Sequence, residues 1–144
     1  MYFLTKKFRS LRVGWNQRPL TEAVFHQLCA RERVKLVEMP LRISGFYMFV
    51  KGRGYIAINS RLRGWKWLKV GFHELGHHYL HGGQPHFYQL CPDMRQECEA
   101  ELFALCALLP LSELRAPAHP ELYEHGFGRE LFAARRKIFE EHGI

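Results

Sequence analysis

The pentapeptide His73-Glu74-Leu75-Gly76-His77 has the residue types and the spacing of a metal-binding catalytic helix. Two histidines four positions apart on a helix project from one face, so both imidazoles can reach a single Zn²⁺. Glu74 lies about 100° around the helix from His73 and can reach a water at the metal without displacing either histidine. Its expected role is that of general base, which takes a proton from the attacking water and returns it to the leaving amine.

A chance match on a histidine-rich helix is the alternative explanation, because H-E-x-x-H fixes only three residues. The flanking residues favour the functional interpretation: positions 70–72 and 79–80 are uncharged, whereas a surface helix carries charge every few positions. Histidines and a glutamate on a buried helix need polar partners, and a metal ion supplies them. The sequence therefore predicts the zinc helix of a metallopeptidase.

A catalytic zinc site needs a third protein ligand and an open fourth position. The metzincin pattern H-E-x-x-H-x-x-G-x-x-H would need a histidine at position 83, which is Gly83, and His81 comes two residues too early. The third ligand is therefore expected on another element, at the acidic start of an apolar helix. Glu97 and Glu101 are four apart and share a face there, so they can serve as ligand and as the group that orients a zinc histidine.

Glu99 belongs to the same acidic segment but points about 200° away from Glu97, and it is expected to be exposed. The alternative interpretation of these glutamates is that they only complement the positive end of the helix dipole. Their number suits that interpretation, but their placement before a buried apolar stripe does not require it.

The elements that must position these side chains follow from local patterns. Helices are expected over 22–33 (capped by Thr21), about 65–80, about 93–109 and about 129–141, a strand over 34–39, and a β-hairpin over 46–59 with its turn at 51–54. This order predicts an α+β fold, in which a small, mostly antiparallel three-stranded sheet packs on helices as in a minimal zincin.

At these motifs the chain resembles the ImmA/IrrE family of small zinc metallopeptidases. The resemblance extends from about Leu20 to Pro110. Four segments carry it, in matching order and spacing: the strand 55–59 that ends in Asn, the H-E-L-G-H-x-x-L-H helix at 73–81, the E-x-E-A-x-x-F-A segment at 97–104 and the L-L-P at 108–110. Together these segments are far more specific than the pentapeptide alone.

The resemblance implies a gluzincin-like site with one Zn²⁺ per chain. Its ligands would be His73, His77 and Glu97, and its catalytic residue Glu74. Glu97 is preferred to Glu99 because of its spacing to the carboxylate one turn later. That carboxylate is a departure from the family, since position 101 is Glu where the family has Asp or Asn.

The resemblance also implies a function, because family members cut or bind transcriptional repressors. The chain is therefore expected to be a zinc-dependent metalloendopeptidase that hydrolyses a repressor-type regulator. The residues before Thr21 leave no room for a fused DNA-binding domain, so the regulator is expected to be a separate polypeptide. The alternatives are a zinc-containing regulator that binds a protein or DNA without proteolysis, and a purely structural zinc site with four protein ligands.

The remaining parts of the mechanism are less specified by the sequence. A peptide substrate is expected to add as a strand along the sheet edge formed by 55–59. Tyr88, His86 and His119 are loop candidates for stabilising the oxyanion, and no spacing selects one of them. Residues 121–141 could resemble a helix-turn-helix, but packing of this segment against the core is preferred.

Size and composition indicate one globular metallopeptidase domain over 1–144, with an irregular lead-in (1–19), a zincin core (20–110) and a helical tail (111–144). No secretory signal and no membrane-spanning apolar run is found, and the four cysteines form no C-x-x-C pair. A cytoplasmic protein with free thiols is therefore expected.

The net charge of +7 can attract nucleic acid, but the basic residues are scattered along the sequence and no nucleic-acid motif accompanies them. Nucleic acid is therefore not the favoured partner, and the sequence does not specify the oligomeric state.

Overall fold

A computed structural model describes residues 1–82 and 94–144, which divide into two compact units. One unit consists of residues 21–104 and contains every residue of the predicted zinc site. The other combines residues 1–20 with residues 105–144. Among the described residues, no helix has the length and apolar character needed to cross a membrane. The predicted α+β class is confirmed by the helices and the single three-stranded sheet of the described part of the chain.

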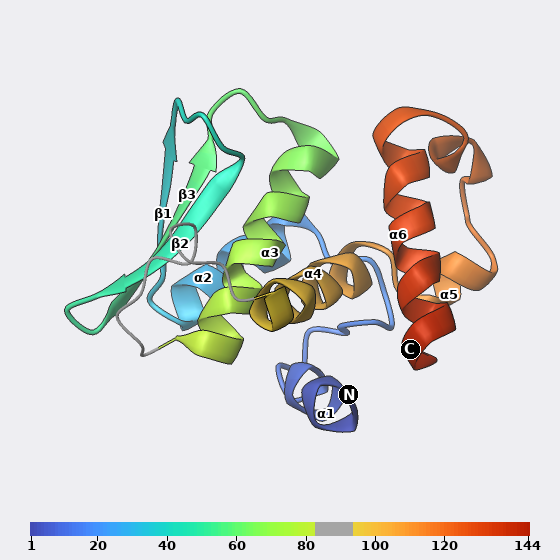
Figure 1. The fold of residues 1–144 in the computed structure, drawn as a ribbon, viewed down its shortest axis with the longest axis horizontal. Coiled ribbons are helices and arrows are strands. Elements are labelled where there is room, and N and C mark those ends of the chain that lie inside the picture. The colour runs from blue at the N-terminus through green and yellow to red at the C-terminus, as the bar shows by residue number, and fades with distance from the viewer. Residues whose placement is uncertain (83–93) are drawn as a thin grey trace. The chain divides into compact units, whose positions relative to one another are not determined.

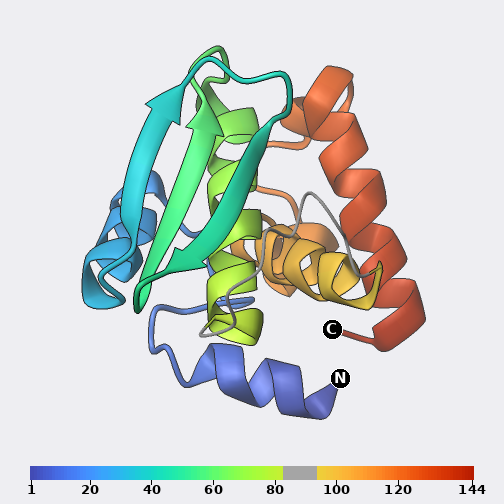
Figure 2. The same cartoon turned by 60° about the vertical axis from the view of Figure 1, so that its left-hand side comes forward.

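The sheet lies in the first unit and has the strand order β1-β3-β2 (Figure 2). Its strands are β1 (Lys35–Met39), β2 (Gly45–Val50) and β3 (Arg53–Asn59). The predicted hairpin is β2–β3, and its turn residues Lys51 and Gly52 have φ values of 51° and 76°. Two successive positive φ angles are typical of the type I′ turns that connect two-residue hairpins.

The pairing of β1 corrects the predicted sheet. β1 pairs with β3 in parallel, so the sheet is mixed and not mostly antiparallel. β3 is consequently the central strand, with both of its edges paired, and it cannot accept a substrate strand. The expectation that residues 55–59 form the substrate edge is wrong, because hydrophobic patterning identifies strands but does not state on which side of a hairpin a third strand adds.

Two helices cover one face of this sheet, as Figures 1 and 2 show. They are α2 (Glu22–Arg31) and α3 (Gly64–His81). The predicted cap of α2 is present, since the Thr21 hydroxyl accepts a hydrogen bond from the Val24 amide at 3.3 Å. The core between sheet and helices is filled by fully buried side chains from both layers: Phe25, Tyr47, Ile56, Ile58, Phe72 and Leu75.

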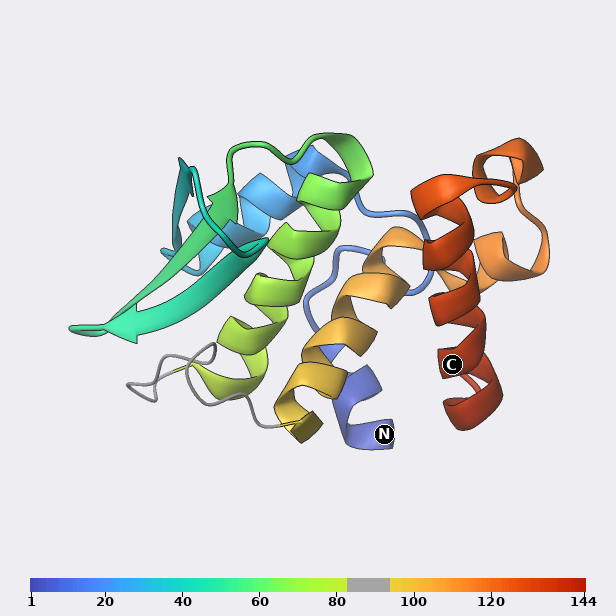
Figure 3. The same cartoon turned by 45° about the horizontal axis from the view of Figure 1, so that its top comes forward.

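A third helix, α4 (Met94–Leu108), lies against α3 and runs in the opposite direction (Figure 3). Gly76 permits the close approach of the two helices, because a Cβ atom there would lie 3.1 Å from the Ala100 Cα. Rings of Phe72 and Phe103 pack edge to face across the same contact, with centroids 6.2 Å apart. Residues near Gly76 on α3 and near Ala100 on α4 are therefore brought together, and these are the predicted zinc ligands.

The second unit contains α1 (Tyr2–Arg9), α5 (Leu111–Arg115), the 3₁₀ helix η1 (Pro120–Tyr123) and α6 (Gly126–His142). The prediction of an irregular segment over 1–19 is wrong for α1, which lacks a side-chain cap and acidic residues in its first turn. The buried Phe8 anchors this helix, and a contact of that kind leaves no local sequence signal. Residues 121–141 do not form a helix-turn-helix, because η1 is a single short 3₁₀ turn.

The described cysteines are thiols. Cys29 and Cys106 are buried, and Cys98 is exposed. Burial raises the pKa of Cys29 to about 12 and that of Cys106 to about 11, which keeps both protonated and unreactive. Cys91 lies outside the described residues.

Candidate metal centre and catalytic cleft

Three nitrogen and oxygen atoms from α3 and α4 converge at one point. The Nε2 of His73 lies 3.1 Å from one carboxylate oxygen of Glu97, and the Nε2 of His77 lies 2.9 Å from the other. One ligand atom from each of the three residues lies within 4.8 Å of the others. Ligand atoms that share a tetrahedral zinc ion at 2.0–2.1 Å stand roughly 3.3 Å apart. The donor set and its spacing therefore fit a metal ion with two imidazoles and one carboxylate.

The second nitrogen of His73 is held by the other glutamate on the same face of α4. His73 donates from Nδ1 to the Glu101 carboxylate at 2.8 Å, which leaves Nε2 as the atom directed at Glu97. Lys69, one turn before His73 on α3, forms an ion pair with Glu101 at 2.6 Å. A carboxylate that accepts from the outer nitrogen of a ligand imidazole fixes its tautomer and its ring orientation. Sequence reasoning missed Lys69, although its spacing of four residues from His73 places it on the same helix face.

Glu99 faces a different partner. Its carboxylate lies 3.4 Å from the Nε2 of His81 and accepts a hydrogen bond from Arg95 at 3.0 Å. The Nδ1 of His81 is in turn 3.4 Å from the Nδ1 of His77. Glu97 and not Glu99 is thus the glutamate that reaches both predicted zinc histidines. His81 contacts the outer nitrogen of His77, and Glu99 contacts His81 in turn. The Glu99 side chain is 18% exposed, contrary to the expectation that it is exposed.

A hydrogen-bonded chain on the opposite side of α3 fixes the rotation of this helix. His78 donates from Nε2 to Glu32 at 3.2 Å, so its Nδ1 accepts the hydrogen bond from the buried Tyr47 hydroxyl at 2.8 Å. Trp67 donates to Glu38 of β1 at 2.9 Å. These bonds tie α3 to the sheet and to the end of α2. They hold His73 and His77 toward α4, because residues one position apart on a helix face different directions.

Glu74 lines a cleft beside the three converging ligands. The cleft has a volume of about 220 Å³ and is bounded by Ser44, Gly45, Lys69, Val70, His73, Glu74 and Glu101. Gly45 is the first residue of the edge strand β2, and Ser44 directly precedes it. Asn59 holds the preceding loop in place, since its side-chain amide donates to the carbonyls of Leu41 and Ile43 at 3.0 and 3.1 Å. The cleft therefore joins the candidate base to a strand edge that is unpaired within the described sheet.

The ionisation of Glu74 suits a general base. Burial of this carboxyl, which is 8% exposed, raises its pKa to about 7, although the neighbouring His73 acts in the opposite direction. A base whose pKa is near neutrality accepts a proton readily and also releases it. The pKa values of the other two carboxyls are lowered instead. The hydrogen bond from His73 lowers the pKa of Glu97. Burial would raise the pKa of Glu101, but its contacts with His73 and Lys69 outweigh burial and lower it to about 2.

The pKa values of the two histidines are shifted in opposite directions. Burial lowers the pKa of His73, but its hydrogen bonds to Glu101 and Glu97 outweigh this effect and raise the pKa to about 9. Burial and the nearby charge of His73 lower the pKa of His77 to about 4. His77 is therefore neutral, with a lone pair available, whereas His73 shares a proton with Glu97 that a metal ion would have to displace.

The predicted oxyanion candidates receive little support. Tyr88 and His86 lie outside the described residues. His119 belongs to the second unit, where it is 69% exposed and its Nδ1 lies 3.3 Å from Glu121. The structure instead places Lys69 and Ser44 at the wall of the cleft.

Comparison with known families identifies the class of the protein. The family model Peptidase_M78, described as the IrrE N-terminal-like domain, matches residues 29–138. This match covers most of the chain, and the chain belongs to this family. Membership supports a metallopeptidase-type function and confirms the resemblance to the ImmA/IrrE family. No curated protein and no solved structure is detectably similar to the chain.

Proposed function

We propose that this chain is a zinc-dependent metalloendopeptidase that acts as a single domain in the cytoplasm and hydrolyses a peptide bond in a separate, repressor-type regulator. The observation that carries the proposal is the convergence of His73, His77 and Glu97 beside a cleft lined by Glu74. The repressor-type substrate is suggested by the family resemblance.

The three converging residues would hold the ion. Two imidazole nitrogens and one carboxylate are the donor set that zinc accepts in hydrolytic enzymes, and they leave a fourth position for the reaction. A zinc ion held there would act as a Lewis acid that acidifies a water molecule and polarises the scissile carbonyl. Glu101 would keep His73 in the tautomer that presents Nε2.

Glu74 would carry the proton. Its carboxylate takes the proton of the attacking water, holds it, and delivers it to the leaving amine nitrogen. Burial raises the pKa of Glu74, which makes its carboxylate a better proton acceptor than an exposed one. The low exposure of the carboxyl limits exchange of this proton with bulk water.

The substrate backbone would add to β2. Within the described residues this strand pairs with β3 on one side only, and its first residue Gly45 lines the cleft beside Glu74. An extended peptide can pair with such an edge by main-chain hydrogen bonds, which position a carbonyl without requiring a particular side chain.

The test is cleavage of the repressor-like protein encoded next to this chain, followed by mass spectrometry of the products. Wild-type protein with zinc should release defined fragments, and Glu74→Gln should lower the rate by roughly 10²–10⁴-fold while it retains the metal. Glu113→Gln, on α5, is a matched control that removes a carboxylate elsewhere and should cut at the wild-type rate.

Full-rate cleavage by Glu74→Gln would remove Glu74 from the mechanism. If the wild-type protein binds the regulator and releases no fragment, the alternative holds, a zinc-containing regulator that acts without proteolysis. The net charge of +7 is the observation that favours this alternative, and salt-sensitive binding unaffected by Glu74→Gln would distinguish it.

A further inference from the structure

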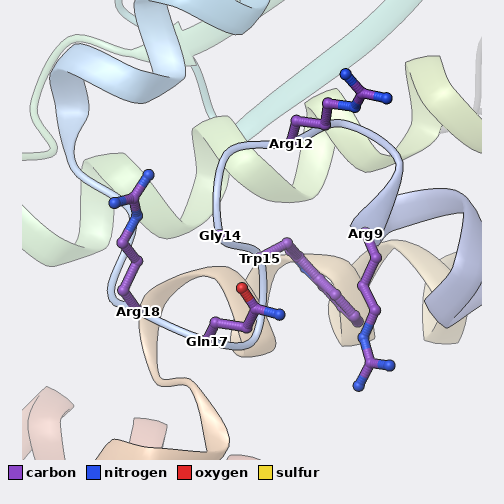
Figure 4. Close-up of a pocket in the computed structure, with 6 residues that line it drawn as sticks. All are labelled: Arg9, Arg12, Gly14, Trp15, Gln17 and Arg18. Atoms are coloured by element: carbon purple, nitrogen blue, oxygen red, sulfur yellow. The ribbon is translucent and has the colours of Figure 1, made fainter.

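Residues 9–18 of the second unit surround a cavity lined by three arginines. The cavity has a volume of about 410 Å³, and its lining residues are Arg9, Arg12, Gly14, Trp15, Gln17 and Arg18. All of them belong to the end of α1 and the loop after it. Figure 4 shows the three arginine side chains leaving this segment at separate points around Trp15. A volume of this size is ordinary for a small-molecule site.

The charge of this cavity has no acidic counterpart within the described residues. None of the six lining residues is acidic, and no ion pair of the described part of the chain involves Arg9, Arg12 or Arg18. Three like charges around one cavity repel each other and attract anions. The arrangement differs from the scattered surface charge that the sequence suggested, because here the cations share one concave wall.

The loop that presents the arginines is held rigidly. Arg12 and Asn16 have positive φ angles of 57° and 60°, a conformation that is uncommon for arginine and that asparagine adopts more readily. The buried Asn16 provides this constraint, since its Oδ1 accepts from the Leu111 amide at 3.0 Å and from the Arg135 guanidinium at 2.9 Å. Arg135 is itself fully buried and also donates to the Leu109 carbonyl at 2.7 Å.

Two further contacts fix the lining itself. Trp15 is 1% exposed and packs against Phe8, with ring centroids 4.9 Å apart. Arg18 donates from Nε to the Val13 carbonyl at 3.2 Å and lies directly over Gly14, where a Cβ would come within 2.6 Å of it. Arg18 is thereby oriented through one of its five N–H groups, and the others remain for a ligand. The fixed loop and the oriented Arg18 lower the entropic cost of binding.

We propose that this cavity binds a small ligand that carries several adjacent phosphate groups, through Arg9, Arg12 and Arg18. Guanidinium groups pair with phosphate oxygens in two parallel hydrogen bonds, which favours phosphate over simple halide ions. Figure 4 shows the three guanidinium groups pointing in different directions around the cavity, so a single phosphate cannot meet all of them, and a ligand with several phosphates can reach more of them. Trp15 is buried and offers no face for stacking a base, so recognition rests on the phosphates.

Isothermal titration calorimetry of the full chain at about 0.15 M salt tests this proposal. The ligands are sodium tripolyphosphate, ATP, orthophosphate and a short DNA duplex. Tripolyphosphate should bind at least about ten-fold more tightly than orthophosphate, because it reaches more than one guanidinium. ATP should bind with the same affinity as tripolyphosphate if the triphosphate is the recognised group, and clearly tighter binding of ATP would contradict recognition through the phosphates alone.

The test variant is Arg9→Gln combined with Arg12→Asn, since asparagine tolerates the positive φ of position 12. It should weaken tripolyphosphate binding by about ten-fold or more. The matched control is Arg129→Gln combined with Arg136→Gln, which removes the same charge from exposed positions on α6 of the same unit. The control should bind within about two-fold of wild type. If the first variant does not fold, Arg9→Gln alone replaces it and should still weaken binding.

Three results would overturn the proposal. The first is that tripolyphosphate produces no binding heat at millimolar concentration. The second is that the control loses as much affinity as the test variant, which would show that binding depends only on net charge. The third is that DNA binds more tightly than tripolyphosphate and resists displacement by it, which would make nucleic acid the occupant.

Discussion

The candidate metal centre and the arginine-lined cavity are both clusters of ionisable groups, and they are built in opposite ways. At the metal centre each histidine faces a carboxylate, with His73 against Glu101 and His77 against Glu97. Around the cavity, Arg9, Arg12 and Arg18 share one sign of charge and have no ion-pair partner in the described part of the chain. The first cluster is largely satisfied by its own members, whereas the second is complete only with an external anion.

The two clusters differ in burial, and this difference determines the free-energy cost of removing one charged side chain from each. His77 is 1% exposed, and a buried charge or hydrogen-bonding group that loses its partner costs several kcal/mol. The arginines of the cavity are exposed, and pairs or repulsions between exposed charges are worth at most about 1 kcal/mol. Removal of one charge should therefore damage the metal centre and leave the loop that carries the arginines intact.

Among the variants that compare the two clusters, Glu101→Ala should have the largest effect. Loss of the carboxylate that orients His73 should weaken zinc binding by about 10- to 100-fold in a chelator competition, because the imidazole loses its fixed tautomer. Glu101→Gln should recover part of this affinity, since its amide oxygen still accepts from Nδ1. Glu130→Ala, an exposed carboxylate on α6, is the control. An affinity within about two-fold of wild type for Glu101→Ala would show that Glu101 does not orient the ligand.

The pH dependence of cleavage should follow Glu74. Its pKa is raised to about 7, chiefly by burial, and only the deprotonated form can accept a proton. At saturating zinc, kcat/KM should therefore fall about ten-fold per pH unit on the acid side, below a midpoint at or under about pH 7, because a bound cation lowers the pKa further. Zinc must be kept saturating because protons compete for the histidines. A rate that stays constant down to about pH 5 with the metal bound would contradict this role.

The smallest effect belongs to the arginine loop. Arg12→Asn should raise the melting temperature by about 1–2 °C at low salt, because it relieves like-charge repulsion and suits the positive φ of 57°. The gain should shrink in about 1 M NaCl, where charges are screened. Differential scanning fluorimetry measures both values, with Arg129→Gln as the control. A melting temperature that falls clearly in Arg12→Asn would indicate that the arginine is part of the fold.

Much of the metal centre could be predicted from the sequence because its spacing is helical. His73 and His77 share a face by their separation of four, and so do Glu97 and Glu101. The structure brings these two pairs together as that spacing suggested. Two contacts between α3 and α4 could not be predicted: His81 with Glu99, and Lys69 with Glu101. They depend on how the two helices are rotated against each other, and the pattern of a single helix does not contain that information.

For the fold, too, local elements could be predicted and tertiary contacts could not. Caps, turns and apolar periodicity located α2, the β2–β3 hairpin, α3 and α4 to within a few residues. The strand order and α1 were not predicted, since they are decided by tertiary contacts, such as the pairing of β1 with β3 and the burial of Phe8. The arginine-lined cavity was missed for the same reason. Its constraint comes from Arg135, which is more than a hundred residues away in sequence.

The zinc content of matched glutamate variants tests the central claim most directly. After dialysis and measurement by inductively coupled plasma mass spectrometry, the wild-type protein should contain about one zinc per chain. Glu97→Gln should lose most of it, because an amide is a poor zinc ligand, whereas Glu99→Gln should keep about one, since Glu99 contacts His81 and Arg95. Zinc retained in Glu97→Gln but lost in Glu99→Gln, or no zinc in the wild-type protein, would contradict the site described here.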